Sequence, residues 1–222
     1  MPPDRFDDAP RVSEALERLG RLAFHDQSMT SVLQTVVDLA KEVLPGTLEA
    51  SISLVVNDKP QTTVSTGQLA VDLDERQYDR GYGPCLHAAA TGELTEITDT
   101  RTDTRWLDYA QVAWERGNGS SLSVPLPIQE RVDGALNIYA REPHAFDEQA
   151  REAAQRFAPY AAVAVANMYA YQNARGMADN LQVALESRAV IDQAKGILME
   201  RHELTAVQAF QVLAGASMRA NR

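Results

Sequence analysis

SLSVPLPI, residues 121–128, and GALNIYAREPHAFDE, residues 134–148, are the two stretches that decide the fold of this chain. Each contains a run of apolar and β-forming residues, Ser121 to Leu126 in the first and Ala135 to Tyr139 in the second. Between the runs, Arg131 and Asp133 stand beside Gly134, a composition typical of a hairpin turn. We therefore predict two adjacent antiparallel strands.

The residues before this hairpin predict further strands, grouped among helices rather than alternating with them. From Ala50 to Val56, apolar residues alternate with Ser51 and Ser53, which is the period of a strand with one buried face. Because crossover helices do not follow the strands one by one, the predicted fold class is α+β, with a mostly antiparallel sheet flanked by helices. The other predicted elements are helices at 12–23, 32–44, 69–78 and 106–115, strands at 61–66 and 94–98, and a turn at 57–60.

The last forty residues have a helical pattern of their own. In SRAVIDQAKGILMERH, residues 187–202, apolar side chains recur from Val190 to Leu198 at the spacing of one helix face, and that face needs a partner. Thr205 and Gln208 then form a capping box that starts a second helix. We expect two short helices that face each other across a tight turn.

Charge is distributed unevenly along the chain. The 222 residues carry a net charge of −10, which is unfavourable for binding a polyanion. Residues 181–222 differ from the rest, with five Lys and Arg against four Asp and Glu. Only this tail can approach phosphate, and composition alone does not predict nucleic-acid binding.

Several classes of protein are excluded by composition. The acidic, Pro-rich start MPPDRFDDAP is not a secretory signal, and the longest apolar run, around 161–166, is too short to span a bilayer. We therefore expect a cytoplasmic protein of one main domain with an appendage and no membrane contact. The single cysteine excludes a disulfide framework, and the four histidines have no ligand spacing, so no metal or cofactor is implied. The sequence contains no recognisable arrangement of catalytic residues.

The tail closely resembles the ANTAR domain, an RNA-binding antitermination module of bacterial regulators. The resemblance lies in residues 187–202 and in the pattern from Ala206 to Leu213 with Ser217 and Asn221. In the family, this domain is a bundle of three helices at the end of a long, often dimerising helix, and it binds paired RNA hairpins in leader transcripts. The resemblance implies that the tail is a partial all-α domain of this kind. The family has a third helix after the Asn221–Arg222 pair, so the resemblance implies that residues 181–222 are a truncated domain without it.

The body resembles a GAF sensory domain of the subtype found directly upstream of ANTAR. The opening stretches carry this resemblance together with QYDRGYGPCLHA, residues 77–88, and DTRW, residues 103–106. It implies an antiparallel sheet with helices on both sides, a small-molecule pocket on one sheet face, and terminal helices that pair between protomers. The expected organisation is a flexible N-terminus at 1–10, a GAF domain at 11–172, a helical linker at 173–180 and the ANTAR part at 181–222.

Four residues are candidates for the ligand pocket. Cys85 is either a redox or nucleophilic thiol, with His87 as its base, or a small buried hydrophobe. A spacing of two on a helix disfavours that pair, because residues i and i+2 point apart. Trp106, Tyr109 and Trp114 either contact ligand or belong to the core. The segment from Gly81 to Cys85 is better explained as a turn before a short helix starting at Pro84 than as a phosphate loop.

The residues from Asp147 to Arg201 form a potential helical connector. Asp147 is expected to cap its start, and a 3-to-4 spacing of apolar residues predicts the seam of a parallel homodimer. Pro159 should kink or restart the helix, and Gly176 should weaken it.

Taken together, the residues and the resemblances predict a signal-responsive regulator. An unknown small molecule or a redox change would act on the GAF domain, and the ANTAR domain would bind dual RNA hairpins. The alternative is a ligand-sensing or protein-interaction module whose C-terminal helices only dimerise. Candidate RNA contacts are the five cationic residues of the tail, which are Arg188, Lys195, Arg201, Arg219 and Arg222.

Overall fold

A computed structural model describes residues 8–23, 25, 27–129 and 132–220 of the chain. These residues form two compact units, of which the first ends at Ala170 and the second begins at Tyr171. The expected turn residue Arg131, the first seven residues of the expected flexible N-terminus, and Asn221 and Arg222 lie outside the described residues.

The first unit is built on a five-stranded sheet of order β2-β1-β5-β4-β3 in which every neighbouring pair is antiparallel. The predicted hairpin is confirmed, because β4 and β5 pair along their length, with Leu126 opposite Gly134. A tight turn at Asn57 and Asp58, both with positive φ, joins the first two strands. The strands are β1 (Thr47–Val56), β2 (Lys59–Ser65), β3 (Thr95–Ile97), β4 (Ser120–Gln129) and β5 (Val132–Ala140).

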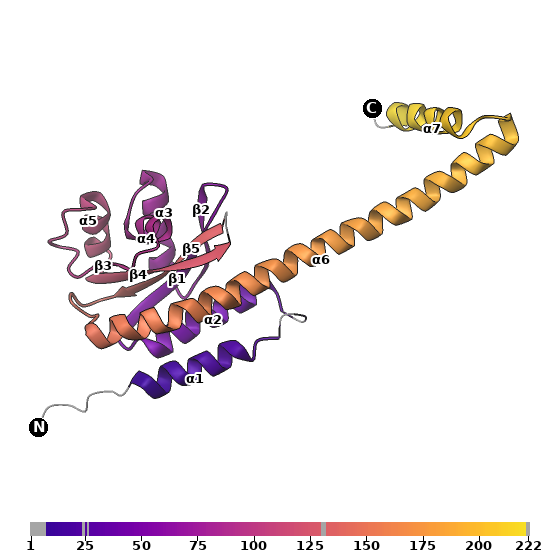
Figure 1. Ribbon diagram of the computed structural model, residues 1–222. Helices are drawn as coiled ribbons and strands as arrows, with labels where there is room; N and C mark the ends of the chain where they lie inside the picture. Colours follow the sequence, from indigo (N-terminus) through magenta and orange to yellow (C-terminus); the bar gives the residue numbers. More distant parts are fainter. Residues whose placement is uncertain (1–7, 24, 26, 130–131, 221–222) are drawn as a thin grey trace, which may run out of the picture. The chain divides into compact units, whose positions relative to one another are not determined.

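Helices cover both faces of this sheet, as expected for the α+β class (Figure 1). One face lies against α2 and the first part of α6, with α1 packed on α2 farther from the sheet, and the other face lies under α3, α4 and α5. The helices are α1 (Asp8–Gly20), α2 (Met29–Val43), α3 (Gln68–Arg80), α4 (Pro84–Thr91), α5 (Leu107–Glu115), α6 (Glu148–His202) and α7 (Ala206–Ala220).

The main hydrophobic core lies between the sheet and the α1, α2 and α6 side. Leu136 and Ile138 of β5 and Ile52 of β1 point to this side and are fully buried, as is Phe157 of α6. Alternation along each strand sends every second side chain into this core. Each Å² of apolar surface removed from water contributes about 25 cal/mol to stability. This core is therefore the principal source of stability for the first unit.

The prediction that β1 has only one buried face was wrong. Ser51 is 0% exposed and Ser53 is 1% exposed, although they alternate with the apolar residues of the strand. The reason is that α3 and α4 cover the face on which these serines lie. The sheet therefore has an apolar buried face and a second buried face that carries polar side chains.

The long helix α6 begins as expected and then differs from the prediction. Asp147 caps its first turn by accepting a hydrogen bond from the amide of Ala150 at 2.8 Å. The helix does not end or restart at Pro159, although proline in a helix interior costs about 3 kcal/mol. Phe157, Ala158 and Ala161 are buried in the core on either side of the proline, and their packing holds the helical path through it.

The second unit contains the end of α6 and all of α7. The predicted capping box is confirmed. The backbone N–H of Gln208 donates to Thr205 Oγ1 at 3.3 Å, and the side-chain Oε1 of Gln208 accepts from the backbone N–H of Thr205 at 2.9 Å. On the apolar side of α7, Ala209 is fully buried but Phe210 is 52% exposed, so the predicted contact between the two helices is narrow. No helix of the described part of the chain is long and apolar enough to cross a membrane.

The fold gives a direct test of the core. Leu136→Ala removes a fully buried side chain and should lower the free energy of unfolding by about 2–5 kcal/mol, because the cavity left behind cannot fully collapse. Urea unfolding followed by circular dichroism measures this change. Leu107→Ala is the matched control, since Leu107 is 63% exposed and its truncation should change stability by less than about 0.5 kcal/mol. Equal effects of the two substitutions would contradict the assignment of the core.

Candidate functional site

The second buried face of the sheet, which we call the polar face, is lined by short polar side chains. Ser51 and Ser53 come from β1, Ser123 from β4, and Asn137 and Tyr139 from β5. All five side chains are buried. Because buried polar groups need hydrogen-bond partners, this face has to be satisfied by the helices that cover it.

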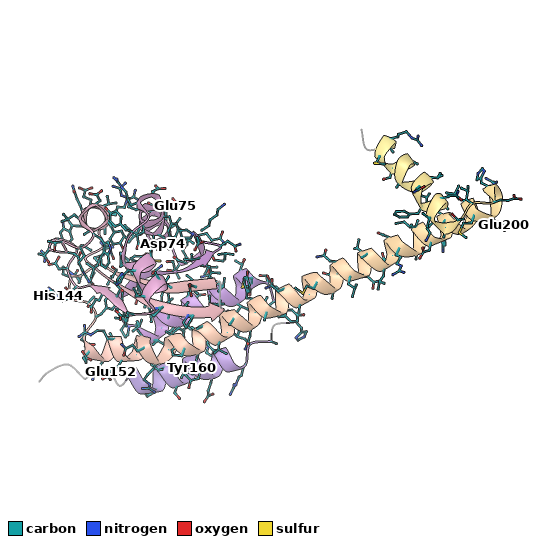
Figure 2. The ribbon with its side chains drawn as sticks, turned by 45° about the horizontal axis from the view of Figure 1, so that its top comes forward. Asp74, Glu75, His144, Glu152, Tyr160 and Glu200 are labelled. Carbon is teal, nitrogen blue, oxygen red and sulfur yellow. The ribbon has the colours of Figure 1, made fainter. Side chains whose placement is uncertain are left out.

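The carboxylate of Asp74, on α3, is the centre of this network. Its Oδ2 accepts hydrogen bonds from Ser51 Oγ at 2.6 Å and Thr62 Oγ1 at 2.9 Å. Its Oδ1 accepts from the Tyr139 hydroxyl at 2.5 Å and from Asn137 Nδ2 at 3.1 Å. Asp74 is 0% exposed, and Figure 2 shows it on the sheet side of its exposed neighbour Glu75. Four donors from three strands thus hold one buried carboxylate.

Two capping interactions place α3 over the network. Glu49 of β1 accepts a hydrogen bond from the amide of Ala70 at 2.8 Å and so satisfies the start of the helix. Gly81 ends it in the left-handed conformation with φ of 70°. The segment from Gly81 onwards forms the predicted turn, and α4 starts at Pro84 as expected.

The buried side chain of Gln77 stabilises the turn between α3 and α4. Gln77 Oε1 accepts a hydrogen bond from the amide of Cys85 at 2.8 Å, and its side chain packs on Gly83, where φ is 153°. A Cβ at Gly83 would lie 2.4 Å from Gln77, so this close approach requires glycine.

Asn137 connects the network to α4 and to β4. Its Nδ2 lies 2.9 Å from Ser53 Oγ and 3.3 Å from Cys85 Sγ, and its Oδ1 accepts from Ser123 Oγ at 2.9 Å. Tyr78 of α3 adds a hydrogen bond from its hydroxyl to Ser53 Oγ at 2.6 Å. The network therefore joins β1, β4 and β5 with two helices.

Burial controls the ionisation of this site. It raises the pKa of Asp74 from its ordinary value of 3.8 to about 6, although hydrogen bonds from Ser51 and Tyr139 favour the charged form. Burial, together with the nearby charge of Asp74, also raises the pKa of the Cys85 thiol to about 12. The thiol therefore stays protonated at neutral pH and is a poor nucleophile.

The structure brings together two of the four predicted pocket residues. Cys85 lies in the network, and Tyr109 of α5 is 2% exposed beside Tyr139. Cys85 is buried as one interpretation required, but its neighbour is the polar Asn137 rather than an apolar group. His87 is exposed, so the two residues point apart as expected.

The two tryptophans differ in their surroundings. Trp114 is 43% exposed and packs against the guanidinium of Arg101 at 5.1 Å, so its interpretation as a core residue was wrong. Trp106 is half-buried: it packs against the buried cluster that contains Tyr109 and Tyr139, and its outer side contacts Arg105 at 4.5 Å and the tilted ring of His87 at 5.9 Å between centroids.

Sequence reasoning missed the residues that make the network. Asp74 was not singled out, and neither were Asn137 or the serines of the polar face. The available signal was a polar residue at every second position of a strand, at 51 and 53 and again at 121 and 123. The same signal is expected from a solvent-facing strand, so it does not distinguish a buried polar face from an exposed one.

The predicted RNA contacts lie on exposed parts of the second unit. Arg188 and Lys195 pair with the same carboxylate, that of Asp192, at 3.7 Å and 3.0 Å. Arg201 and Arg219 are exposed. Arg222 lies outside the described residues.

Comparison with known proteins divides the chain in the same order as the structure. The family model of the GAF domain matches residues 26–166, and the family model of the ANTAR domain matches residues 179–222. None of the curated proteins matches the chain.

Solved structures resemble the first unit in fold. The reduced form of fRMsr of Staphylococcus aureus is 15% identical, with 73% of this chain and 97% of that chain covered and a TM-score of 0.56. Free methionine-R-sulfoxide reductase from Neisseria meningitidis, in complex with its substrate, is 18% identical over 75% and 96%, with a TM-score of 0.56. The chromophore-binding domain of a bacteriophytochrome from R. palustris is 11% identical over 76% and 64%, also with a TM-score of 0.56. At these identities the likeness is one of fold alone.

The raised pKa of Asp74 predicts a specific pH dependence of stability. The folded protein binds this proton more tightly than the unfolded chain, so the contribution is present below pH 4 and lost as the pH rises through 6. The free energy of unfolding of the wild type, minus that of Asp74→Asn, should fall by roughly 2 kcal/mol between pH 4 and pH 7. Urea unfolding at each pH measures it.

If the difference in unfolding free energy between the wild type and Asp74→Asn does not change between pH 4 and pH 7, Asp74 is not a buried carboxylate with a raised pKa. Ser123→Ala serves as the control, because Ser123 bonds to Asn137 and leaves Asp74 in place. This variant should therefore keep the pH dependence of the wild type.

The raised pKa of Cys85 predicts an unreactive thiol. In the folded protein, the reaction of this single cysteine with Ellman's reagent at pH 8 should be at least ~10-fold slower than in urea-unfolded protein, because little thiolate forms and burial blocks access. Absorbance of the released thiolate follows both reactions. Equal rates would show that the thiol is accessible and would reopen a redox function.

Proposed function

Because the chain belongs to the GAF domain family and carries an ANTAR domain behind it, we propose that it is a signal-responsive, RNA-binding regulator of transcription antitermination. The observation that carries this proposal is the order of the two domains in one chain. Both families are regulatory, which fits a protein that is not an enzyme.

The polar face is the proposed sensing site for a small molecule. Besides the Asp74 network, the hydroxyls of Tyr109 and Ser121 are buried there and lie near each other, but neither makes a hydrogen bond of normal geometry to the described residues. Unpaired buried hydroxyls are costly, and a polar ligand that binds them would recover that cost. Since Asp74, Asn137 and Tyr109 are at most 2% exposed, entry requires α3, α4 or α5 to separate from the sheet.

A small-molecule signal is better supported than a redox signal. The chain has one cysteine, which is buried, and its thiol has a pKa of about 12. A redox-sensing cysteine is instead exposed and forms thiolate readily. Of the two kinds of signal expected from the sequence, we therefore favour the small molecule.

The ANTAR part is the proposed RNA-binding element, and paired hairpins in leader transcripts are its proposed target. The described tail presents Arg188, Lys195, Arg201 and Arg219 to solvent to different degrees. These side chains are the proposed phosphate and base contacts, together with Arg222. Contacts between these cations and phosphates release counterions, so binding should weaken with salt. The net charge of −10 opposes binding, and salt screens that repulsion.

A homodimer through the second unit would place two RNA-binding elements together. Apolar side chains on α6 beyond the first unit are more than half exposed, which is unfavourable for a lone helix in water. The residues are Met177, Leu181, Val183, Leu185, Val190 and Ile197. Pairing with a second copy would bury one face of the helix, such as the face that carries Met177, Leu181 and Leu185.

We propose that α6 couples the two activities. The helix starts in the first unit and continues into the second, so a ligand that changes how protomers pack along it would change how two tails grip two hairpins. Such coupling is typically worth about 1–3 kcal/mol, so ligand should change RNA affinity by ~5- to 150-fold.

The competing function is dimerisation alone. It is favoured by one observation: the charges of Arg188 and Lys195 are partly neutralised by Asp192, whose pKa is lowered by Lys195 and by Arg188. In that case the tail would pair with its copy and bind no RNA.

Salt titration of RNA binding distinguishes the two functions. With the full-length protein and a synthetic RNA of two adjacent stem-loops, Arg188→Ala and Lys195→Ala should each lower affinity and reduce the slope of log affinity against log salt by about one, since each removes one phosphate contact. Fluorescence anisotropy of labelled RNA gives affinity and slope.

Arg175→Ala is the matched control, because Arg175 is an exposed arginine on the same helix but precedes the ANTAR match. Unchanged affinity and slope in both test variants would remove these residues from the interface. A protein that sediments as a dimer and yet binds no RNA at low salt would support dimerisation alone.

A further inference from the structure

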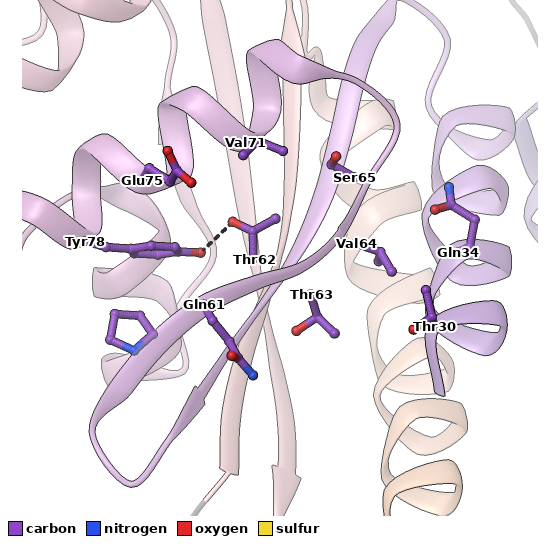
Figure 3. A pocket seen from close by; sticks show the side chains of 11 residues that line it. Thr30, Gln34, Gln61, Thr62, Thr63, Val64, Ser65, Val71, Glu75 and Tyr78 are labelled. Atoms are coloured by element: carbon purple, nitrogen blue, oxygen red, sulfur yellow. Dashed lines mark hydrogen bonds between the residues drawn. The ribbon is translucent and has the colours of Figure 1, made fainter. Parts of the chain in front are cut away.

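A cavity separate from the polar face lies beside the edge strand β2, between α2 and α3 (Figure 3). Its volume of about 510 Å³ is in the range of small-molecule sites. Thr30 and Gln34 line it from α2, and Glu75 and Tyr78 line it from α3 on the other side of the strand. The remaining lining residues are Val71 of α3 and residues 60–65 of β2.

The charge of this cavity has one sign. Glu75 is its acidic lining residue, and no lysine, arginine or histidine is among the residues that line it. The other polar groups are hydroxyls and side-chain amides, which offer oxygen acceptors beside the carboxylate. In a chain of net charge −10, a concave wall with this lining concentrates negative potential and attracts cations.

A second carboxylate lies directly behind the wall. Thr62 and Tyr78 line the cavity, and their hydroxyls lie 3.1 Å apart. Thr62 Oγ1 also donates to Asp74 Oδ2 at 2.9 Å, and the Tyr78 hydroxyl donates to Ser53 at 2.6 Å. The cavity and the buried network thus share two side chains, and the negative charge of Asp74 adds to that of Glu75.

The lining also supplies apolar contact. Val71, Pro60 and the ring of Tyr78 offer apolar contact to a ligand, and Glu75 and the hydroxyls would bind its charged end. An added peptide strand fits less well. Thr63 has no partner in the register between Val64 and Thr62, and such bulges, like prolines, hinder strand addition at a sheet edge.

We propose that this cavity is a binding site for a small organic cation that joins a primary ammonium group to an apolar body. The ammonium group donates to the Glu75 carboxylate and to neighbouring hydroxyl or amide oxygens, and the body packs on Val71 and on Tyr78. The site is separate from the polar face and from RNA binding, and it touches the Asp74 network only through Thr62 and Tyr78.

Calorimetry of the full-length protein with tyramine tests this site. Tyramine carries a primary ammonium on an aromatic body, and 4-ethylphenol has the same ring and hydroxyl without the ammonium. We expect saturable binding of one tyramine per chain and at least 10-fold weaker binding of 4-ethylphenol. Absence of saturable tyramine binding at low salt would overturn the proposal.

Two substitutions locate the bound amine. Glu75→Gln should weaken tyramine binding at least 10-fold, and Val71→Phe should do the same by filling the cavity while keeping the carboxylate. Glu14→Gln, at an exposed glutamate of α1 that does not line the cavity, is the control and should leave the affinity unchanged.

Unfolding curves of each variant establish that it folds. An affinity unchanged by either Glu75→Gln or Val71→Phe would place tyramine elsewhere and overturn the proposal. Because no RNA takes part, failure of this test is distinguishable from failure of the RNA-binding proposal.

Discussion

The carboxylate of Asp74 is buried and ionisable, and such a group is tolerated only where donors surround it. That requirement determines the arrangement of one half of the first unit. The donors come from β1, β2 and β5, so α3 has to lie across these three strands. Once α3 is in place, Gln77 fastens the turn into α4, and α4 brings Cys85 against Asn137. The helices on this side of the sheet are thus positioned by polar contacts, whereas those on the opposite side are positioned by apolar burial.

This division gives the two sides of the sheet different mechanical properties. Apolar packing is non-directional, so the core around Leu136 and Phe157 depends on close packing rather than on fixed donor and acceptor positions. Hydrogen bonds to a buried carboxylate are directional, and a loss of one donor leaves a charge poorly compensated. A ligand that enters the polar face therefore acts on an arrangement with few intermediate states. Such an arrangement suits a sensor, in which two discrete packings are more useful than a continuous deformation.

The strands, their pairing and the α+β class could be predicted from the chain because β4 and β5 have clear runs and a clear turn between them. The ANTAR domain at the end of the chain could be predicted because residues 187–202 keep polar positions that periodicity does not fix. The polar face could not, since Ser51 and Ser53 give the same alternation whether water or a helix lies above them. Asp74 was missed because a carboxylate within a helical pattern is normally solvent-exposed. The path of α6 through Pro159 and the exposure of Trp114 both depended on tertiary neighbours that local rules do not contain.

Asn137 shows what such a network means for the history of the sequence. An aspartate at this position would set a second carboxylate beside Asp74, and a leucine would leave Asp74 and Ser123 each short of a partner. Asp74 is constrained in the same way, because an amide there has one acceptor oxygen in place of the two that accept from four donors. A substitution at either position alone should therefore destabilise the network, and a change at one position is best tolerated when the other changes with it.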